Sequence, residues 1–217
     1  MSVTMYGFWR SLAAFRVRAA LNYKEIPFNE KIIDLVQGDQ FSDDYHALNP
    51  QHVIPLLDHD GKHITQSLTI LEYIEQTWPQ NTIMPKDAYL QSYVRSISLI
   101  TIADTHPLVV PRVRGFLHKT YGQDEAGQGA WARHWLNEGS KAIEARLINE
   151  KLSGKYTLGD EITLADFALC SHVIGARLFE ADLSLAPRLV EIANHCLELD
   201  AFGKAHPLKQ PGAPIKK

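Results

Sequence analysis

The spacing of hydrophobic positions differs between the two halves of the chain. Up to about residue 80, short apolar runs typical of strands are mixed with apolar stripes at helical spacing. Residues 3–9, 28–34, 54–58 and 62–65 are interpreted as strands, and residues 12–24, 41–48 and a segment starting at Ser67 as helices. Asp60-Gly61, between the last two strands, is a strong hairpin signal. This order predicts a small mixed sheet with helices on both faces.

From residue 88 onward the spacing is helical, and no strand is predicted. The helical segments are residues 89–108, 128–150 and 187–206, the last of which holds one or two helices. Pro107 and Pro111 are expected to kink or break the helical path. Two prolines and an asparagine make residues 79–87 typical of a linker. The sequence therefore predicts an α/β domain over residues 1–80, a linker over 79–87 and an all-helical domain over 88–217.

The clearest helix start lies at Thr163. Thr163 and Asp166 stand three residues apart, as in a capping box in which aspartate replaces the usual glutamate. Ile162 and Phe167 are placed for the hydrophobic staple that accompanies this motif. A structural role is therefore predicted for Thr163.

Composition and charge exclude several classes of protein. The 217 residues are 45% hydrophobic and 22% charged, which is typical of a globular protein rather than a disordered one. The formal charge of −3 argues against a nucleic-acid partner, and no apolar run approaches the roughly 18 residues of a membrane span. No secretory signal is seen, and two cysteines, Cys170 and Cys196, make no disulfide framework, so a cytoplasmic location is expected. No Cys/His cluster has zinc spacing, so no metal site is predicted.

The first candidate functional residue lies where the first predicted strand meets the first predicted helix. Ser11 lies at this junction, where a hydroxyl and a helix N-terminus can stabilise an anion such as a thiolate. Ser67 opens a later helix in the same way and can hold a carboxylate. Either serine can equally be a plain helix cap, and spacing alone does not separate the two roles. Arg10 is placed to face an anionic substrate or to lie on the surface, and Arg16 and Arg18 are interpreted as members of structural ion pairs.

Several segments together resemble the glutathione transferase family, specifically its zeta class, the maleylacetoacetate isomerases. The resemblance covers nearly the whole chain, and its most specific part is Phe8-Trp9-Arg10-Ser11-Leu12-Ala13-Ala14-Phe15-Arg16-Val17-Arg18-Ala19-Ala20-Leu21. Further matches are Ala47-Leu48-Asn49-Pro50, Ile54-Pro55, Gln66-Ser67-Leu68-Thr69-Ile70-Leu71-Glu72-Tyr73, Gly159-Asp160 through Asp166, and Asp200-Ala201-Phe202. The resemblance implies a thioredoxin-like α/β domain followed by an all-α domain, with glutathione as cofactor.

The resemblance also implies roles for individual residues. Ser11 would stabilise the glutathione thiolate, and the backbone of Ile54, ahead of a cis-proline at Pro55, would pair with the cysteinyl part. Gln66 and Ser67 would hold the γ-glutamyl carboxylate. The residues implied to bind the cofactor are thus Ser11, Gln40, Ile54, Gln66, Ser67 and His106.

Departures from the family pattern concern the substrate more than the cofactor. The second signature serine is Leu12, an expected asparagine is Val110, and an Arg-Phe pair that receives substrate carboxylates reads Leu178-Phe179. Arg177 is shifted by one position, a rotation of about 100° on a helix. The side chains expected to bind substrate are Arg10, Arg112 and Arg177, and the residues expected to be catalytic are Ser11 and Arg10.

The function that the resemblance implies is glutathione-dependent cis–trans isomerisation of a maleyl diketo acid in aromatic catabolism. Addition of the thiolate to the conjugated alkene makes that bond single, so that it can rotate before glutathione leaves. Two alternatives stay open, namely conjugation or dehalogenation of electrophiles, and glutathione or ligand binding without turnover. The expected partners are a small unsaturated dicarboxylate or electrophile and a second copy of the chain.

Overall fold

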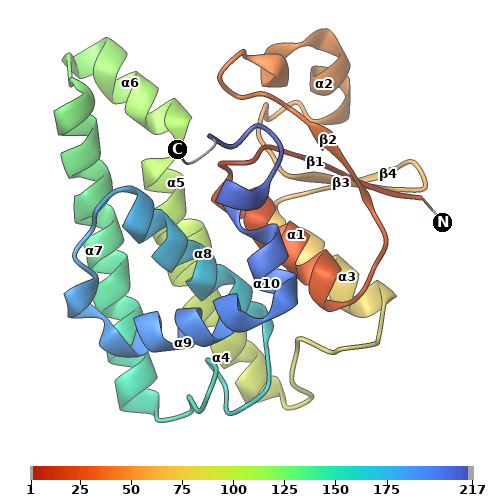
Figure 1. Cartoon of the computed structure of the whole chain (residues 1–217), viewed down its shortest axis with the longest axis vertical. Helices are drawn as coiled ribbons and strands as arrows, with labels where there is room; N and C mark the ends of the chain where they lie inside the picture. The colour runs from red at the N-terminus through yellow and green to blue at the C-terminus, as the bar shows by residue number, and fades with distance from the viewer. Residues whose placement is uncertain (1, 215–217) are drawn as a thin grey trace. The chain divides into compact units, whose positions relative to one another are not determined.

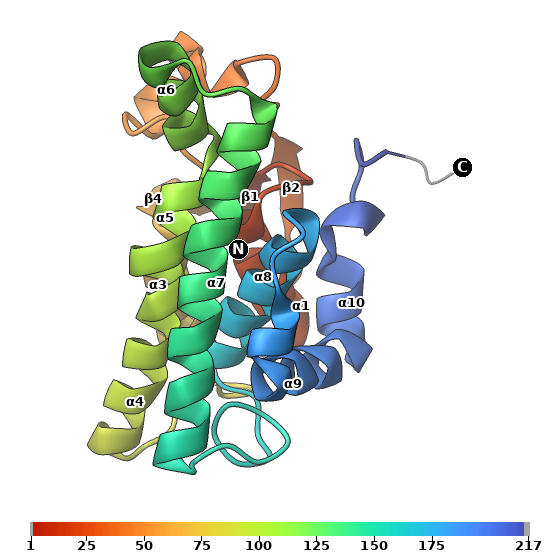
Figure 2. The same cartoon turned by 90° about the vertical axis from the view of Figure 1, so that its left-hand side faces the viewer.

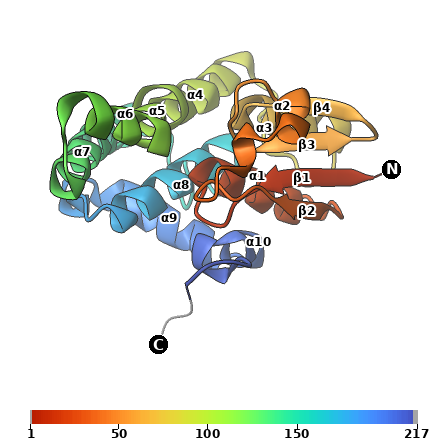
Figure 3. The same cartoon turned by 90° about the horizontal axis from the view of Figure 1, so that it is seen from above.

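Four short strands form one mixed sheet in the computed structural model, which describes residues 2–214 (Figure 1). The strands are β1 (Val3–Gly7), β2 (Asn29–Ile32), β3 (Leu56–His59) and β4 (Lys62–Thr65). Their order is β2-β1-β3-β4, visible as neighbouring strands in Figure 3, with β1 and β2 parallel and the other pairs antiparallel. The predicted mixed sheet is confirmed.

Local chemistry explains where two of the strands begin and end. Strand β3 begins at Leu56 rather than at residue 54, because Pro55 has no N–H to donate to a neighbouring strand. Asp60 and Gly61, with φ of 50° and 80°, form the turn between β3 and β4. Positive φ at both central residues is what a tight hairpin turn requires, so the predicted hairpin is confirmed.

Helices cover both faces of this sheet, as predicted. The helices of this part are α1 (Leu12–Tyr23), a 3-10 turn η1 (Asp39–Phe41), α2 (Asp43–Leu48) and α3 (Ser67–Thr77). One face packs Met5 and Leu57 against α1 and α3, and the other packs Tyr6 and Leu56 against Tyr45 of α2. Alternate residues of a strand point to opposite faces, which is why neighbours in sequence enter different cores.

The described chain divides into two units. Unit 1 runs up to Thr82 and also includes the residues from Glu198 onward, and unit 2 is Ile83–Leu197. Helix α10 (Asp200–Ala205) belongs to unit 1, because Arg18 Nη1 and Asn22 Nδ2 of α1 donate to backbone carbonyls of α10, at 3.1 and 3.2 Å. A 3-10 turn, η4 (Pro207–Lys209), follows it. The sequence-based division had placed these residues in the all-helical part.

The regular structure of unit 2 is helical (Figure 2). Its elements are α4 (Ala88–Leu99), a π-helix η2 (Ile100–Thr105), α5 (His106–Val109), α6 (Pro111–Tyr121), α7 (Glu125–Glu150), α8 (Leu164–Leu178), a 3-10 turn η3 (Leu183–Leu185) and α9 (Pro187–Glu198). Between residues 83 and 197, two isolated bridges are the only β-pairing. No helix among the described residues has the length and apolar character needed to cross a membrane.

Two local predictions for unit 2 need correction. The path does not break at Pro107: the π-helix η2 carries it into α5, and the break falls between α5 and Pro111. A π-helix shifts the hydrogen-bond partner by one residue, and here the N–H of His106 donates to the carbonyl of Thr101. Helix α6 was not predicted, although Val113, Phe116 and Leu117 lie at helical spacing, and none of its residues is buried.

Helix α8 is the centre of unit 2, and the predicted capping box begins it. The thirteen consecutive positions from Leu164 to Ala176 are buried, so this helix is enclosed on all sides. The Asp166 carboxylate accepts from the backbone N–H and the hydroxyl of Thr163, at 2.7 and 2.9 Å, and from those of Thr157, at 2.9 and 2.6 Å. Thr163 therefore has the structural role that was predicted.

Candidate functional site

Register places several of the predicted site segments at one edge of the sheet. Gly7 pairs with Ile32, Tyr6 with Leu56, and Leu56 in turn with Thr65. Because β3 runs opposite to the other strands, the ends of β1, β2 and β4 and the start of β3 meet at this edge. The segments that follow or precede these ends are 8–11, 33–41, 54–55 and 66–67. Unit 1 thus gathers the predicted residues Ser11, Gln40, Ile54, Gln66 and Ser67 at one edge.

Ser11 is the N-cap of α1. Its backbone is extended, with φ −73° and ψ 117°, and its Oγ accepts a hydrogen bond from the N–H of Ala14 at 3.1 Å. Ser11 therefore caps the helix, and in this role its hydroxyl only accepts a hydrogen bond. The hydroxyl proton can still be donated to an anion, so the two roles considered for Ser11 are compatible. The N-terminus of α1 adds positive potential at the same point.

Ser67 is buried and contacts an arginine from α1. It is the first residue of α3 rather than its cap, which is Gln66. Ser67 Oγ accepts from Arg16 Nε at 3.1 Å. Burial lowers the pKa of Arg16 to about 9, because the buried guanidinium loses its hydration. A group with this pKa is still protonated at neutral pH, so a cation contacts the first residue of α3. The expected ion pair is confirmed for Arg18, whose Nη2 lies 2.6 Å from Glu30 Oε1.

Gln66 has an unusual backbone conformation for its type, with φ 65° and ψ 118°. Few residues other than glycine adopt positive φ, and such strain is concentrated at functional sites. The side-chain Nε2 of Gln66 donates to Gln51 Oε1 at 2.9 Å, which links the start of α3 to the segment before β3. In that segment the Ile54-Pro55 peptide bond is cis, as the resemblance implied.

Gln40 carries an observation that bears on a bound ligand. Its Oε1 is buried and has no hydrogen-bond partner among the described residues. A buried amide oxygen without a donor is costly, and it is satisfied when a ligand supplies an N–H. Glutathione has such donors in its two peptide groups and its amine. The residues at this edge therefore fit the tripeptide: Gln40 offers an acceptor, and Ser11 and Ser67 offer hydroxyls.

The predicted residues of unit 2 lie on three different helices. His106 is half-buried and begins α5, directly after the π-helix. Arg112 is exposed in the first turn of α6. Arg177 is exposed in the last turn of α8, and its Nη2 donates to Asn194 Oδ1 of α9 at 2.7 Å. Arg10, in unit 1, is exposed just before Ser11.

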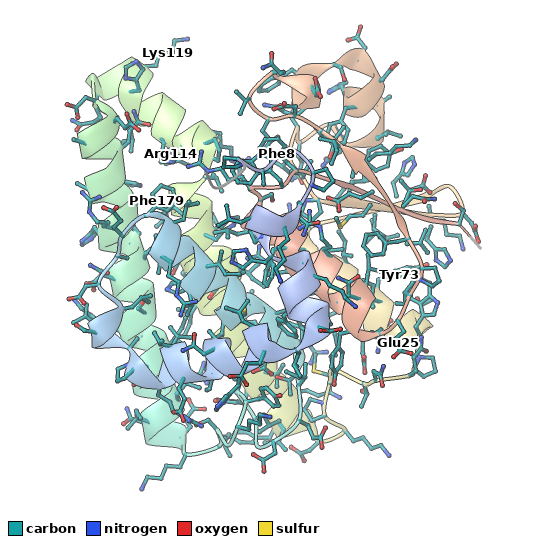
Figure 4. All side chains as sticks on the ribbon, in the orientation of Figure 1. Phe8, Glu25, Tyr73, Arg114, Lys119 and Phe179 are labelled. Carbon is teal, nitrogen blue, oxygen red and sulfur yellow. The ribbon has the colours of Figure 1, made fainter. Side chains whose placement is uncertain are left out.

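Sequence reasoning missed a further guanidinium, that of Arg114. Its carbon Cζ lies 5.1 Å from the centroid of the Phe179 ring, and its Nε donates to the carbonyl of Val109 at 3.1 Å (Figure 4). Phe179 is the C-cap of α8, 65 positions away along the chain, so no local pattern relates the two residues. The helix that carries Arg114 was itself not predicted, and no signal in the sequence pointed to this pair.

Other reactive groups have structural settings. Cys170 and Cys196 are free and buried, and burial raises the pKa of each thiol, which keeps both protonated. Among the described residues, no group of three or more His, Cys, Asp or Glu side chains is placed to hold a metal ion.

Comparison with known proteins relates the chain to glutathione-dependent enzymes. Residues 1–76 match the family described as Glutathione S-transferase, N-terminal domain. A maleylpyruvate isomerase from Ralstonia sp. is 38% identical over 95% of this chain and 98% of its own. A maleylacetoacetate isomerase from Dictyostelium discoideum is 39% identical over 96% of this chain and 95% of its own.

Solved structures give the same relationship. The maleylacetoacetate isomerase of Methylobacterium extorquens AM1, solved with bound malonate and glutathione, superposes with a TM-score of 0.95. It is 43% identical and covers 98% of this chain and 100% of its own. A holo maleylpyruvate isomerase, described as a bacterial transferase of the zeta class, also has a TM-score of 0.95, at 37% identity over 97% of this chain and 100% of its own.

Proposed function

This chain belongs to the zeta class of the glutathione transferase family, and on that basis we propose that it isomerises a maleyl diketo acid with glutathione as cofactor. The observation that carries the proposal is the placement of Ser11 at the N-terminus of α1, at the sheet edge shared with Gln40, Ile54 and Gln66. Relatives at 38 and 39% identity over nearly the whole chain are named maleylpyruvate and maleylacetoacetate isomerase.

We propose that unit 1 binds glutathione through Ser11, Gln40, Ile54, Gln66 and Ser67. Bound glutathione supplies a thiolate that adds reversibly to the conjugated alkene and so allows its rotation. Ser11 stabilises the thiolate by donating a hydrogen bond from its hydroxyl, while its Oγ continues to accept a hydrogen bond from the N–H of Ala14. Ser67 holds a carboxylate, and the buried Arg16 behind it adds positive potential.

We propose that unit 2 is the substrate-binding domain and that His106 extends the cofactor site. A diketo diacid carries two negative charges, and the chain has a formal charge of −3, so local cations must attract the substrate. Arg10 and Arg112, both exposed, are proposed to bind its carboxylates. Arg177 is proposed as a third contact, and it would have to exchange its bond to Asn194.

We also propose that the protein is a cytoplasmic homodimer. Membership of the family supports the dimer, and the two free cysteines support a reducing compartment. Light scattering coupled to size-exclusion chromatography tests the dimer directly. A mass near that of one chain at micromolar concentration would contradict it.

Incubation with glutathione and a maleyl diketo acid tests the proposed reaction. Isomerisation changes the absorbance of the substrate and leaves the thiol concentration constant. Conjugation consumes thiol, and the replacements at Leu12, Val110 and Leu178 make conjugation or dehalogenation of electrophiles the second candidate function. Binding of glutathione with no change in substrate or thiol would instead identify a protein without turnover.

A further inference from the structure

Two histidines connect α2 to the segment that carries Gln40. His52 Nδ1 lies 2.7 Å from the backbone oxygen of Gln40. His52 Nε2 lies 3.2 Å from Nδ1 of His46, which is on α2, and the two rings stack with centroids 4.8 Å apart. The Phe41 ring also contacts His52, at 5.3 Å between centroids. One side chain thus joins three parts of this region.

The direction of these bonds follows from simple chemistry. A carbonyl oxygen can only accept, so His52 Nδ1 must carry a proton and donate it to Gln40. In neutral His52 the other nitrogen, Nε2, is then an acceptor, and His46 donates to it from Nδ1. The two bonds form a directed chain from α2 through His52 to Gln40.

The position of His52 is itself constrained. Its φ is 56°, a left-handed conformation that favours glycine and asparagine over other residues. Its neighbour Gln51 accepts from Gln66, at the start of α3. The segment 51–52 therefore connects to Gln40 on one side and to Gln66 on the other, and both are proposed cofactor-binding residues.

We infer that His52 is a positioning residue for glutathione. By holding the backbone of Gln40, it keeps the buried Oε1 of that residue fixed, so that this oxygen accepts an N–H from the bound tripeptide. His52 itself does not touch the cofactor in this proposal. The inference rests on the proposed function, since it requires that the chain binds glutathione.

Three substitutions of His52 separate its two bonds. His52→Gly removes the imidazole at a position where positive φ suits glycine, so backbone strain does not confuse the result. Asparagine places its amide nitrogen near the site of Nδ1 and tolerates the left-handed conformation, so His52→Asn keeps the donor to Gln40. Glutamine places its amide near the site of Nε2, so His52→Gln loses that donor.

Calorimetric titration with glutathione, together with steady-state kinetics, tests the inference. Loss of one neutral hydrogen bond changes an equilibrium constant by about two- to tenfold. His52→Gly and His52→Gln should therefore raise the Kd for glutathione by about that factor. His52→Asn should restore the wild-type Kd to within about twofold. In all three variants kcat at saturating glutathione should stay unchanged, because His52 does not act on the reacting atoms.

The outcomes distinguish this inference from the proposed function. If the wild-type protein binds no glutathione, the proposed function fails and the inference fails with it. If the wild type binds glutathione and His52→Gly binds it equally well, only the role of His52 is overturned. Equal weakening in His52→Asn and His52→Gln would also overturn it, because the donor to Gln40 would then be irrelevant. Should His52→Gly fail to fold, the comparison of the Asn and Gln variants still decides.

Discussion

Replacing Ser11 with alanine and, separately, with glycine separates the two roles of its hydroxyl. The Oγ caps α1 by accepting from the N–H of Ala14 at 3.1 Å, and its proton is proposed to stabilise the thiolate of glutathione. Both substitutions remove the hydroxyl. They differ in the cap, because glycine is a far better N-cap than alanine.

The expected magnitudes follow from this geometry. Loss of the cap should reduce the free energy of unfolding by about 1 kcal/mol in Ser11→Ala and by only a few tenths of that in Ser11→Gly. Loss of an oxyanion-type donor should lower kcat/KM by about 100- to 1000-fold in both variants. The pKa of the bound thiol should also rise toward the ordinary value of about 8.5 in both.

Urea unfolding measures the first effect, isomerase kinetics the second, and the ultraviolet absorbance of the thiolate against pH the third. Ser11→Thr is the matched control, since it keeps a hydroxyl in a residue that also caps helices. Retention of most of the activity by Ser11→Gly would refute the reasoning, and the backbone amides at the start of α1 would then be the groups that activate the thiol. If activity instead fell only in proportion to the loss of stability across the three Ser11 variants, Ser11 would act only as a helix cap.

Four further outcomes are expected. Ser67→Ala should weaken glutathione binding by roughly 1.5–3 kcal/mol in calorimetry, and should also lower the melting temperature because Arg16 loses an acceptor; unchanged affinity would leave Ser67 a purely structural residue. Arg10→Met should lower kcat/KM for a dicarboxylate by at least about tenfold and change activity toward a chloronitrobenzene much less; equal losses would show that Arg10 does not recognise charge. Thr163→Ala should reduce the free energy of unfolding by about 0.5–2 kcal/mol and leave kcat unchanged, so lost catalysis with a normal melting curve would contradict it. Burial lowers the pKa of His172 to about 4, and because the unfolded chain then binds this proton more readily, stability should fall by about 2 kcal/mol from pH 7 to pH 5. Urea unfolding of the wild type and His172→Gln should show that slope in the wild type alone.

Much of the fold was predictable because its signals are local. The hairpin at Asp60-Gly61 depends on two adjacent residues that accept positive φ, and the start of α8 depends on Thr163 and Asp166, three positions apart. Interactions over so few residues form wherever the chain can adopt them. The four strands and most of the helices were also predicted, since the spacing of hydrophobic residues along a short segment is a local signal as well.

The sequence also placed most of the proposed cofactor site, through motifs rather than through geometry. Ser11, Ile54 and Gln66 were identified by the segments that contain them, and the sheet register then placed those segments at one edge. Sequence alone left Ser11 as either a cap or a donor. The structure shows that the cap uses a lone pair and so allows both.

Long-range contacts were decided only by the tertiary structure. Ser67 meets Arg16 across 51 positions, and Arg114 lies on Phe179 across 65, although neither pair shares a pattern along the chain. The contact of His52 with Gln40 spans only 12 positions, but it depends on a left-handed residue and on the path of α2 between them. Periodicity reports which face of an element is buried, and it does not report which side chain of another element meets that face. That choice is made when whole elements pack together, because only packing sets the distances at which hydrogen bonds and ring contacts form.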